Sequence, residues 1–365
     1  MRIAQIAPLA EAVPPKLYGG TERVVFWLTE ELVEMGHEVT LFASGDSVTS
    51  ANLEPISPKA LRLDRNSPDP MLVYAAMLAR VAELSDHFDV VHAHIDWIHI
   101  PLLRSLGVPF VTTLHGRLDH PALATLCSRC FPDAHFVSIS DAQRNPLPDA
   151  NWVGTVYHGL PENLLTPNYE PKGYLAFLGR ITPDKGPETA IQLARAAGLP
   201  LKIAAKIVRS ERRYFTQRIE PLLDGTDVEF VGEIDEAHKA EFLGNAAVLL
   251  FPIDWPEPFG LVMIEAMACG TPVVAFRCGS VPEVIDDGIT GYAVEPDYGV
   301  NAISRAVRLN RKRVRQRFEE RFTGRRMAQD YVGIYDNILN TSHRFEGQAR
   351  VEYMPDRRAL TPRPN

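Results

Sequence analysis

Cysteine is scarce in this chain of 365 residues, which has only four: Cys127, Cys130, Cys269 and Cys278. So few cysteines exclude a disulfide framework, and we expect a protein of the reducing cytoplasm. Cys127 and Cys130 form one C-x-x-C pair without the second pair that a zinc site needs, and we interpret the pair as incidental. Long apolar runs are also missing, since none approaches the ~18 residues of a membrane-spanning helix. Residues 1–2 lead directly into a strand pattern, so we expect neither a membrane anchor nor a signal peptide.

Positive charge is in deficit. The 38 Lys and Arg residues face 46 Asp and Glu residues, for a net charge of −8, which disfavours non-specific binding to nucleic acid. A local exception is the basic segment 305–326, whose basic residues between these bounds are Arg308, Arg311, Lys312, Arg313, Arg315, Arg317, Arg321 and Arg325. Because Glu319 and Glu320 interrupt it, the simpler interpretation is a pair of solvated helices. Weak contact with a membrane surface or an anionic acceptor is the alternative.

Apolar runs of strand type alternate with helical patterns along most of the chain. This alternation predicts an α/β fold with parallel sheets and right-handed crossovers. One set of strands is expected at residues 3–7, 39–42, 90–93, 110–114 and 136–139. A second set is expected at residues 175–178, 201–205, 229–231, 248–251, 273–275 and 292–294.

The periodicity breaks near residues 160–172, where Pro161, Pro167 and Pro171 follow one another closely. We therefore predict two doubly wound, Rossmann-like domains, at residues 1–165 and 170–323. A helix at 324–341 follows, with Tyr331 and Tyr335 on its apolar face. The tail 342–365 mixes Pro, Arg and Glu without periodicity, and we expect it to be disordered.

The most informative stretch is residues 256–265 (PEPFGLVMIE), between a strand pattern and a helix. Glu257 lies in the loop after the strand, and Glu265 lies about one and a half turns into the helix. The N–H groups of Gly260, Leu261 and Val262 at the helix start form an anion site suited to phosphate. Two carboxylates beside such a site are suited to hydroxyl groups, because each can accept two hydrogen bonds from a vicinal diol. Phosphate and diols together indicate a nucleotide sugar, whereas two solvated surface acids are the simpler alternative.

A second element, residues 179–186 (GRITPDKG), follows the strand pattern at 174–178. Its Arg180 and Lys185 are cations suited to a phosphate group. The alternative is a turn with two solvated cations. Because the segment follows a strand, as the two glutamates do, we favour the phosphate interpretation.

Two further candidates lie near the N-terminus. Gly19 and Gly20 follow the first strand, where glycine lets the backbone approach a ligand closely, and a helix opens at Thr21. The spacing is not G-x-G-x-x-G, so a nicotinamide-dependent oxidoreductase is disfavoured. His115 ends the strand 110–114, and histidine is the usual near-neutral polar group of catalytic sites, although a lone histidine is more often structural.

Together these motifs resemble the retaining glycosyltransferases of family 4, which have the GT-B fold, and the resemblance extends to about residue 339. Glu257 and Glu265 match the family's E-x7-E signature, and residues 179–186 match its G-R-x-x-x-x-K-G element. Residues 279–292 (GSVPEVIDDGITGY) match a further family motif with a scaffolding role. One departure is His158, at a place where members usually show Asn before Gly. The resemblance implies two Rossmann-like domains that face each other across a cleft, with the C-terminal helix crossing back onto the first.

The resemblance also implies roles for these residues. The predicted catalytic residues are His115, Arg180, Lys185 and Glu257. The predicted donor-binding residues are Gly19, Gly20, Pro258, Phe259, Gly260, Leu261, Val262 and Glu265. In family members the first glutamate contacts the transferred sugar, the second holds the ribose, and the Arg and Lys clasp the diphosphate.

Several histidines raise the question of a metal site. His92, His94 and Asp96 share one face if the strand extends that far, and His99 follows. In the family this segment is a buried strand with a variable acceptor-side loop, so contact of His94, Asp96 or His158 with the acceptor stays open. The sequence contains no D-x-D, the usual Mg²⁺ or Mn²⁺ clamp of the other glycosyltransferase fold. We expect no metal or other cofactor.

The function that the resemblance implies is retaining transfer of a hexosyl group from a nucleotide sugar to an acceptor hydroxyl, without a covalent glycosyl-enzyme. UDP-glucose is the first choice of donor and GDP-mannose the second. The acceptor is a glycan, a lipid-linked sugar or a small metabolite, and the oligomeric state is open. A nucleotide-sugar epimerase and a non-catalytic sugar-nucleotide sensor are the alternatives.

Overall fold

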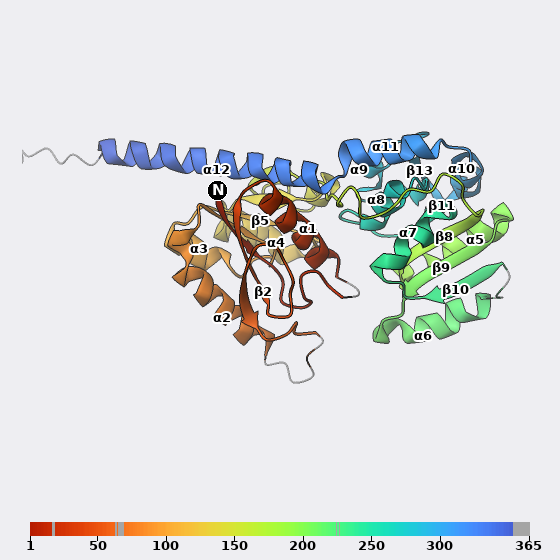
Figure 1. The fold of residues 1–365 in the computed structure, drawn as a ribbon, viewed down its shortest axis with the longest axis horizontal. Helices are drawn as coiled ribbons and strands as arrows, with labels where there is room; N and C mark the ends of the chain where they lie inside the picture. The colour runs from red at the N-terminus through yellow and green to blue at the C-terminus, as the bar shows by residue number, and fades with distance from the viewer. Residues whose placement is uncertain (17–18, 63, 65–68, 224, 226, 353–365) are drawn as a thin grey trace, which may run out of the picture.

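A computed structural model shows two lobes, each built around one parallel sheet (Figure 1). It describes residues 1–16, 19–62, 64, 69–223, 225 and 227–352. Residues 17–18 of the glycine loop and residues 353–365 of the predicted tail lie outside the described residues. No helix in the described part of the chain combines the length and the apolar character needed to cross a bilayer.

The first lobe contains a seven-stranded sheet in the order β3-β2-β1-β4-β5-β6-β7. Its strands are β1 (Arg2–Ile6), β2 (Glu38–Ser44), β3 (Asn52–Ser57), β4 (Val90–Ala93), β5 (Phe110–Thr113), β6 (Phe136–Ser138) and β7 (Trp152–Thr155). The five predicted strands are confirmed, and the two that the sequence did not predict, β3 and β7, are the edges. Edge strands tolerate residues that central strands exclude, such as Pro55 in β3 and Gly154 in β7.

The second lobe contains a six-stranded sheet in the order β10-β9-β8-β11-β12-β13, and all six predicted strands are confirmed. They are β8 (Tyr174–Arg180), β9 (Leu201–Lys206), β10 (Val228–Gly232), β11 (Ala246–Phe251), β12 (Val273–Phe276) and β13 (Gly291–Val294). Every residue of the central strand β11 is buried, as expected for a parallel strand covered by helices on both faces.

Helices connect these parallel strands. In the first lobe they are α1 (Gly20–Glu34), α2 (Pro70–Glu83), α3 (Ile100–Leu106) and α4 (Pro121–Thr125). In the second lobe they are α5 (Pro187–Ala197), α6 (Arg212–Tyr214), α7 (Glu236–Gly244), α8 (Leu261–Ala268), α9 (Val281–Val284), α10 (Gly299–Ala306) and α11 (Arg311–Arg321).

Strand order reverses at one place in each sheet, between β1 and β4 and between β8 and β11. The loops that leave the carboxyl ends of such neighbouring strands run in opposite directions and open a crevice. The predicted Arg180 ends β8, and the loops after β8 and β11 carry the predicted Lys185 and Glu257. The topology therefore places the predicted donor residues where doubly wound sheets bind ligands.

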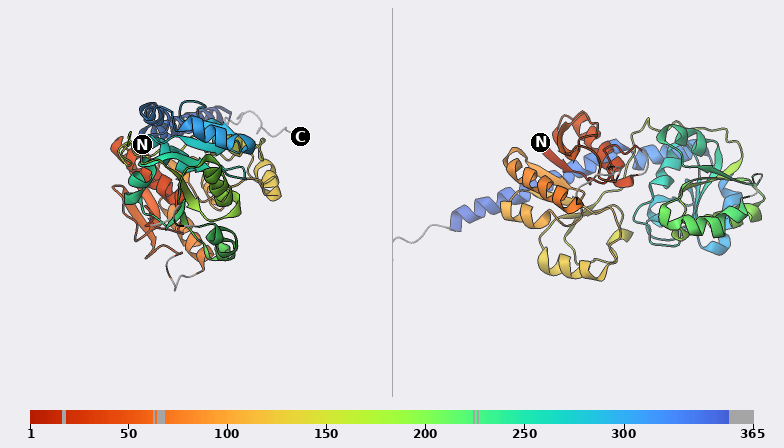
Figure 2. Two further views of the ribbon diagram at one scale, coloured as in Figure 1. Left: turned by 90° about the vertical axis from the view of Figure 1, so that its right-hand side faces the viewer. Right: turned by 90° about the horizontal axis from the view of Figure 1, so that it is seen from below.

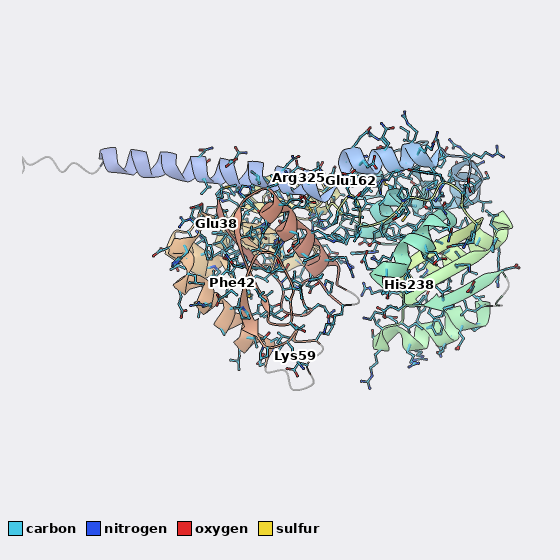
Figure 3. All side chains as sticks on the ribbon, in the orientation of Figure 1. Glu38, Phe42, Lys59, Glu162, His238 and Arg325 are labelled. Carbon is cyan, nitrogen blue, oxygen red and sulfur yellow. The ribbon has the colours of Figure 1, made fainter. Side chains whose placement is uncertain are left out.

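The last helix, α12 (Gly324–Glu352), crosses back over the first lobe (Figures 1 and 2). It packs against α1, where Arg325 lies 4.0 Å from Glu31, and Figure 3 labels Arg325 at its start. The helix continues through residues 342–352, past its predicted end at 341, and the disorder expected of the tail stays a prediction. This stretch contains helix-forming Arg, Glu, Gln and Ala, and the first helix-breaking proline, Pro355, comes only after it.

The two connections between the lobes lie side by side. The Leu160 N–H donates to the Phe322 carbonyl at 2.9 Å, and the Gly324 N–H donates to the Leu160 carbonyl at 2.6 Å. A Cβ at Gly159 would lie 2.1 Å from the Thr323 carbonyl oxygen, so only glycine fits there. The chain thus leaves the first lobe and returns to it through one narrow junction.

The basic segment 305–326 is not the pair of solvated helices that its composition suggested. Arg311 and Arg315 are buried and donate to backbone carbonyl groups of the second lobe and the connection before it. Arg317 and Arg321 both bond the Asp286 carboxylate. Four of its arginines therefore hold the second lobe together.

Candidate active site

A cavity of about 570 Å³ lies between the two lobes. The loop after β1, the start of α1 and the end of β5 line it from the first lobe, and the loops after β8 and β11 with the start of α8 line it from the second. All twelve predicted site residues line this cavity: Gly19, Gly20, His115, Arg180, Lys185, Glu257, Pro258, Phe259, Gly260, Leu261, Val262 and Glu265. The structure brings them together, and their roles in a reaction remain predictions.

The start of α8 is shaped by Gly260, which caps the helix at φ +81°. A Cβ there would lie 2.9 Å from the Met263 Cε and 3.1 Å from the Phe251 ring. Glycine is therefore required by both the backbone angle and the close packing. Gly260, Leu261 and Val262 at this end of α8 line the cavity, and the first N–H groups of a helix are those without an acceptor one turn earlier.

The predicted catalytic residues Lys185 and Glu257 form an ion pair within the cavity wall, and both side chains are largely buried. The Lys185 ammonium also lies 4.9 Å from the centre of the Trp255 ring. Gly186, at φ +71°, lets the Lys185 loop pack on the β11 loop, because a Cβ there would lie 2.1 Å from the Pro252 carbonyl oxygen. The ammonium is thus held beside the carboxylate by the packing of the two loops.

Glu265, the second predicted carboxylate, is 4% exposed and accepts a hydrogen bond from Lys239 at 2.6 Å. Lys239 also lies 3.3 Å from Glu236, which forms an ion pair with Arg23 of the first lobe. Burial lowers the pKa of Lys239, but Glu265 and Glu236 raise it, and the net shift is upward. These four residues form a charged bridge across the cleft, with Glu265 at its inner end.

From the first lobe, α1 begins at Gly20 directly opposite α8. A Cβ at Gly20 would lie 3.7 Å from Leu261 Cδ1, and one at Gly19 would lie 2.8 Å from the Pro15 side chain. The amino ends of two helices therefore approach the same cavity, and such ends favour negatively charged groups.

His115 lines the cavity from the end of β5 in the first lobe. Its Nε2 lies 2.8 Å from His94 Nδ1, and its ring stacks on that of His158 with centroids 5.4 Å apart. The His158 ring in turn meets the edge of Phe259, from the Glu257 loop, at 4.8 Å. Burial lowers the pKa of His115 to about 3 and also lowers that of His158, so both rings are neutral at pH 7.

Residues 279–292 support the Glu257 loop. The Ser280 N–H donates to the Glu257 carbonyl at 3.0 Å, and its hydroxyl donates to the Phe259 carbonyl at 2.7 Å. Glu283 accepts the N–H groups of Asp141 and Ala142 of the first lobe, each at 2.7 Å. The segment therefore has the scaffolding role that its motif predicted, and it also ties the lobes together.

Comparison with known proteins identifies the family. The model described as Glycosyl transferases group 1 matches residues 166–321, and the model described as Glycosyltransferase Family 4 matches residues 18–151. Together the two models cover well over half of the chain. The chain belongs to the family 4, group 1 glycosyltransferases.

Individual relatives of this glycosyltransferase are distant. It is 26% identical to the N-acetyl-alpha-D-glucosaminyl L-malate synthase of Bacillus anthracis, over 88% of this chain and 94% of the relative. Sucrose-phosphate synthase from Thermosynechococcus elongatus matches with a TM-score of 0.74 and 22% identity, over 93% of this chain and 100% of that one. Anabaena HepE in complex with UDP and glucose has a TM-score of 0.68, with 18% identity over 92% and 100%. These structures share the GT-B fold that the resemblance implied.

The glycosyltransferase also lines its cleft with residues that the sequence did not single out. The helical patterns that contain Arg23, Glu236 and Lys239 gave no indication that these residues lie at a ligand site. Their position in the cavity wall follows only from the packing of α7 beside α8 and α1. Glu22 also lines the cavity, and burial is the main cause that raises the pKa of its carboxyl group.

The histidines that suggested a metal serve as hydrogen-bonding groups of the first lobe. His92 Nε2 lies 2.7 Å from the Thr113 hydroxyl, and His99 Nε2 lies 2.8 Å from the Thr112 hydroxyl. No group of three or more His, Cys, Asp or Glu within the described ranges could hold a metal ion. Of the residues considered for acceptor contact, His158 lines the cavity, whereas His94 is buried behind His115.

Proposed function

We propose that this glycosyltransferase transfers a hexosyl group, with retention of anomeric configuration and without a metal ion, from a nucleoside diphosphate sugar to an acceptor hydroxyl. UDP-glucose is the first candidate donor and GDP-mannose the second. The observation that carries the proposal is the convergence of two cations, two carboxylates and two helix amino ends on one interlobe cavity.

The charges in the cavity suit a nucleotide sugar. Arg180 and Lys185 lie at the switch point beside the amino end of α8, which suits the diphosphate. Glu257 and Glu265 are acceptors for hydroxyl groups, and eight positions along the chain separate them, so one can address the sugar and the other the ribose. The two cations supply the charge that a metal ion supplies at diphosphates elsewhere, which supports the metal-independent form of the proposal.

The proposed reaction breaks the bond between the anomeric carbon and the diphosphate oxygen and forms a bond between that carbon and the acceptor oxygen. The departing phosphate oxygen takes the proton of the acceptor hydroxyl, so no protein base and no covalent glycosyl-enzyme are needed. Arg180 and Lys185 stabilise the nucleoside diphosphate as its charge grows, Glu257 and His115 orient the sugar, and closure of the lobes excludes water.

The choice of UDP-glucose draws on the structures that share the fold, since Anabaena HepE was solved with UDP and glucose. The phosphatidyl-myo-inositol mannosyltransferase of Propionibacterium freudenreichii is 26% identical over 91% of both chains, which keeps GDP-mannose as the second candidate. Acceptors among the named relatives range from malate to inositol compounds, so the proposed acceptor class stays broad.

A donor screen tests the proposal. The purified protein in EDTA is mixed with UDP-, GDP- and ADP-sugars, and its melting temperature and the slow release of nucleoside diphosphate are followed. We expect one donor class to stabilise and to be hydrolysed, with both effects lost in Glu265→Ala and hydrolysis lost in Arg180→Ala. Glu241→Ala, on the exposed side of α7, is the matched control and should behave as wild type.

Three outcomes contradict the proposal. Binding of a donor without any release of nucleotide, with or without candidate acceptors, favours a sensor, and conversion of the donor sugar without release favours an epimerase. No response to any nucleotide sugar rejects the proposed donor class altogether.

A further inference from the structure

A chain of buried hydrogen bonds runs from the crossover helix to His115. Gln5 Nε2 donates to the Tyr335 hydroxyl at 3.2 Å, and Gln5 Oε1 lies 2.9 Å from His94 Nε2. His94 Nδ1 lies 2.8 Å from His115 Nε2. Gln5 and Tyr335 are completely buried, and His94 is 3% exposed. The His115 ring is therefore held from behind by groups that water does not reach.

The orientation of the Gln5 amide fixes the direction of these bonds. Its carbonyl oxygen can only accept, so His94 Nε2 must carry a proton. Burial lowers the pKa of His94 and of His115, so each ring is neutral at pH 7 and holds a single proton. His94 Nδ1 then accepts from His115, and the one proton of His115 lies on Nε2. His115 Nδ1 is left as a lone pair.

The other branch of the network has the same direction. The Tyr335 hydroxyl accepts from Gln5 and is 2.8 Å from His92 Nδ1, to which it donates. His92 Nε2 then carries the proton and donates to the Thr113 hydroxyl at 2.7 Å. Every polar atom of this branch has a partner in this arrangement of protons, which follows from the same orientation of the Gln5 amide as the assignment at His94 and His115.

His115 Nδ1 is buried and has no hydrogen-bond partner among the described residues. The His115 ring lines the cavity and stacks on His158. The unpartnered Nδ1 therefore belongs to a residue of the cavity wall. A buried acceptor without a partner destabilises the folded protein unless something binds it. A hydroxyl donor from a ligand in the cavity would satisfy it.

We infer that Gln5 and His94 are positioning residues that hold His115 in its Nε2–H form, so that Nδ1 accepts a hydrogen bond from a hydroxyl of the transferred sugar. This inference rests on the proposed function, because it takes the ligand of the cavity to be a nucleotide sugar. It assigns a role to two core residues that contact the donor only through His115, and it links that role to α12 through Tyr335.

Nuclear magnetic resonance of the full-length protein labelled with ¹⁵N-histidine tests the inference. We expect His115, assigned by the loss of its signals in His115→Gln, to show a protonated Nε2 and an unprotonated Nδ1. Addition of UDP-glucose or GDP-mannose should shift the Nδ1 signal in the direction of a hydrogen-bonded acceptor. A proton on Nδ1 in the free protein overturns the inference whatever the activity of the protein is.

Variants at His94 separate positioning from folding. Asn in His94→Asn keeps an acceptor for His115 Nε2–H, whereas His94→Leu removes it. We expect His94→Leu to lower the rate constant of donor hydrolysis about tenfold at saturating donor, the effect of one lost hydrogen bond, and His94→Asn to restore most of it. His99→Leu is the matched control, because His99 is equally buried but bonds Thr112 outside the network.

The outcomes are distinguishable from failure of the proposed function. If a donor binds but neither shifts His115 Nδ1 nor distinguishes His94→Leu from His99→Leu, the inference is wrong and the proposed function stands. If no donor changes the melting temperature, the proposed function fails, and a sugar hydroxyl as the partner of Nδ1 fails with it.

Discussion

The Lys185 ammonium donates to the Glu257 carboxylate, so two residues expected to act on different parts of the donor are paired with each other in the cavity wall. The pair holds each side chain in place and offsets its charge. A diphosphate must compete with Glu257 for Lys185, and a sugar hydroxyl can take the released carboxylate. The proposed function therefore predicts that entry of the donor and exchange of these partners are one event.

This exchange predicts the effect of removing the lysine. Lys185→Met should lower the rate of nucleotide release by about 100-fold or more, because it removes one group that stabilises the leaving diphosphate. The measurement is the rate of nucleoside diphosphate release at saturating donor. Lys172→Met is the control, since Lys172 is exposed and 3.8 Å from an exposed Glu241. Equal rates for the two variants would contradict the role of Lys185.

Substitution of Glu265 is expected to weaken nucleotide binding, in contrast to the effect of Lys185→Met on the rate. Glu265→Gln should weaken binding of the free nucleoside diphosphate about tenfold or more, because a ribose diol loses a charge-assisted acceptor and Lys239 loses its nearest partner. Calorimetric titration with UDP and GDP gives the dissociation constants. Glu241→Gln, an exposed position on α7, should leave them unchanged. An unchanged constant in Glu265→Gln would place the ribose elsewhere.

Two glycines with similar backbone angles predict different consequences. Gly279 (φ +55°) and Gly288 (φ +76°) both strain any other residue, but a Cβ at Gly279 would lie 2.4 Å from the Glu257 carbonyl oxygen, whereas one at Gly288 meets nothing closer than 3.9 Å. Gly288→Ala should cost about 1–2 kcal/mol of unfolding free energy and leave turnover unchanged. Gly279→Ala should also displace the Glu257 loop.

We expect turnover in Gly279→Ala to fall at least about tenfold, since small displacements of positioned groups are costly in catalysis. Parallel urea unfolding and turnover assays check both variants. Retention of full turnover in Gly279→Ala would show that the 279–292 segment does not position Glu257.

Arg311 predicts a large effect on stability alone. Its guanidinium donates to the carbonyls of Asn168, Gly244 and Ala246 and to the Thr271 hydroxyl. Arg311→Met leaves several of these buried acceptors without a partner and should cost about 3 kcal/mol or more. The exposed Arg313, two residues later on α11, is the control and should tolerate Met. Urea midpoints that agree between the two variants would contradict this account.

The buried histidines predict a dependence of stability on pH. Burial lowers the pKa of His99 and His115 to about 3, below the value of about 6.5 expected in the unfolded chain. The unfolded state therefore binds more protons below pH 6.5, and stability that is complete above that pH is lost as the pH falls toward 3. Each such histidine contributes a slope of about 1.4 kcal/mol per pH unit in this window.

Urea unfolding at intervals between pH 7 and pH 5 measures this slope. In His99→Leu this slope should decrease by about the contribution of one histidine. The His99 ring of the wild type lies outside the cavity, so its removal should leave donor binding unchanged. An identical slope in wild type and His99→Leu would mean that His99 is protonated in the folded protein at these pH values.

The sequence predicted those parts of the site that depend on local order along the chain. Arg180, Lys185 and Glu257 follow buried strands directly, and parallel strands bring their carboxyl ends to one edge, so pattern alone places these residues together. The edge strands β3 and β7 were missed because they lack the continuous apolar pattern of central strands.

Groups that come together only through tertiary packing could not be predicted. Arg23 and Glu236 are 213 positions apart, and Gln5 and Tyr335 are 330 positions apart. Nothing in a helical pattern distinguishes a glutamate that crosses the cleft from one that faces water. The buried Arg311 was misinterpreted for the same reason, because the composition around it is that of an exposed helix.

The measurement that tests the central claim most directly is donor hydrolysis in ¹⁸O-water with EDTA present. Mass spectrometry of the products shows which bond to the donor breaks. The proposed transfer predicts ¹⁸O in the released sugar and none in the nucleoside diphosphate, with release abolished in Arg180→Ala. Appearance of ¹⁸O in the phosphate, or release that requires a divalent metal ion, would contradict it.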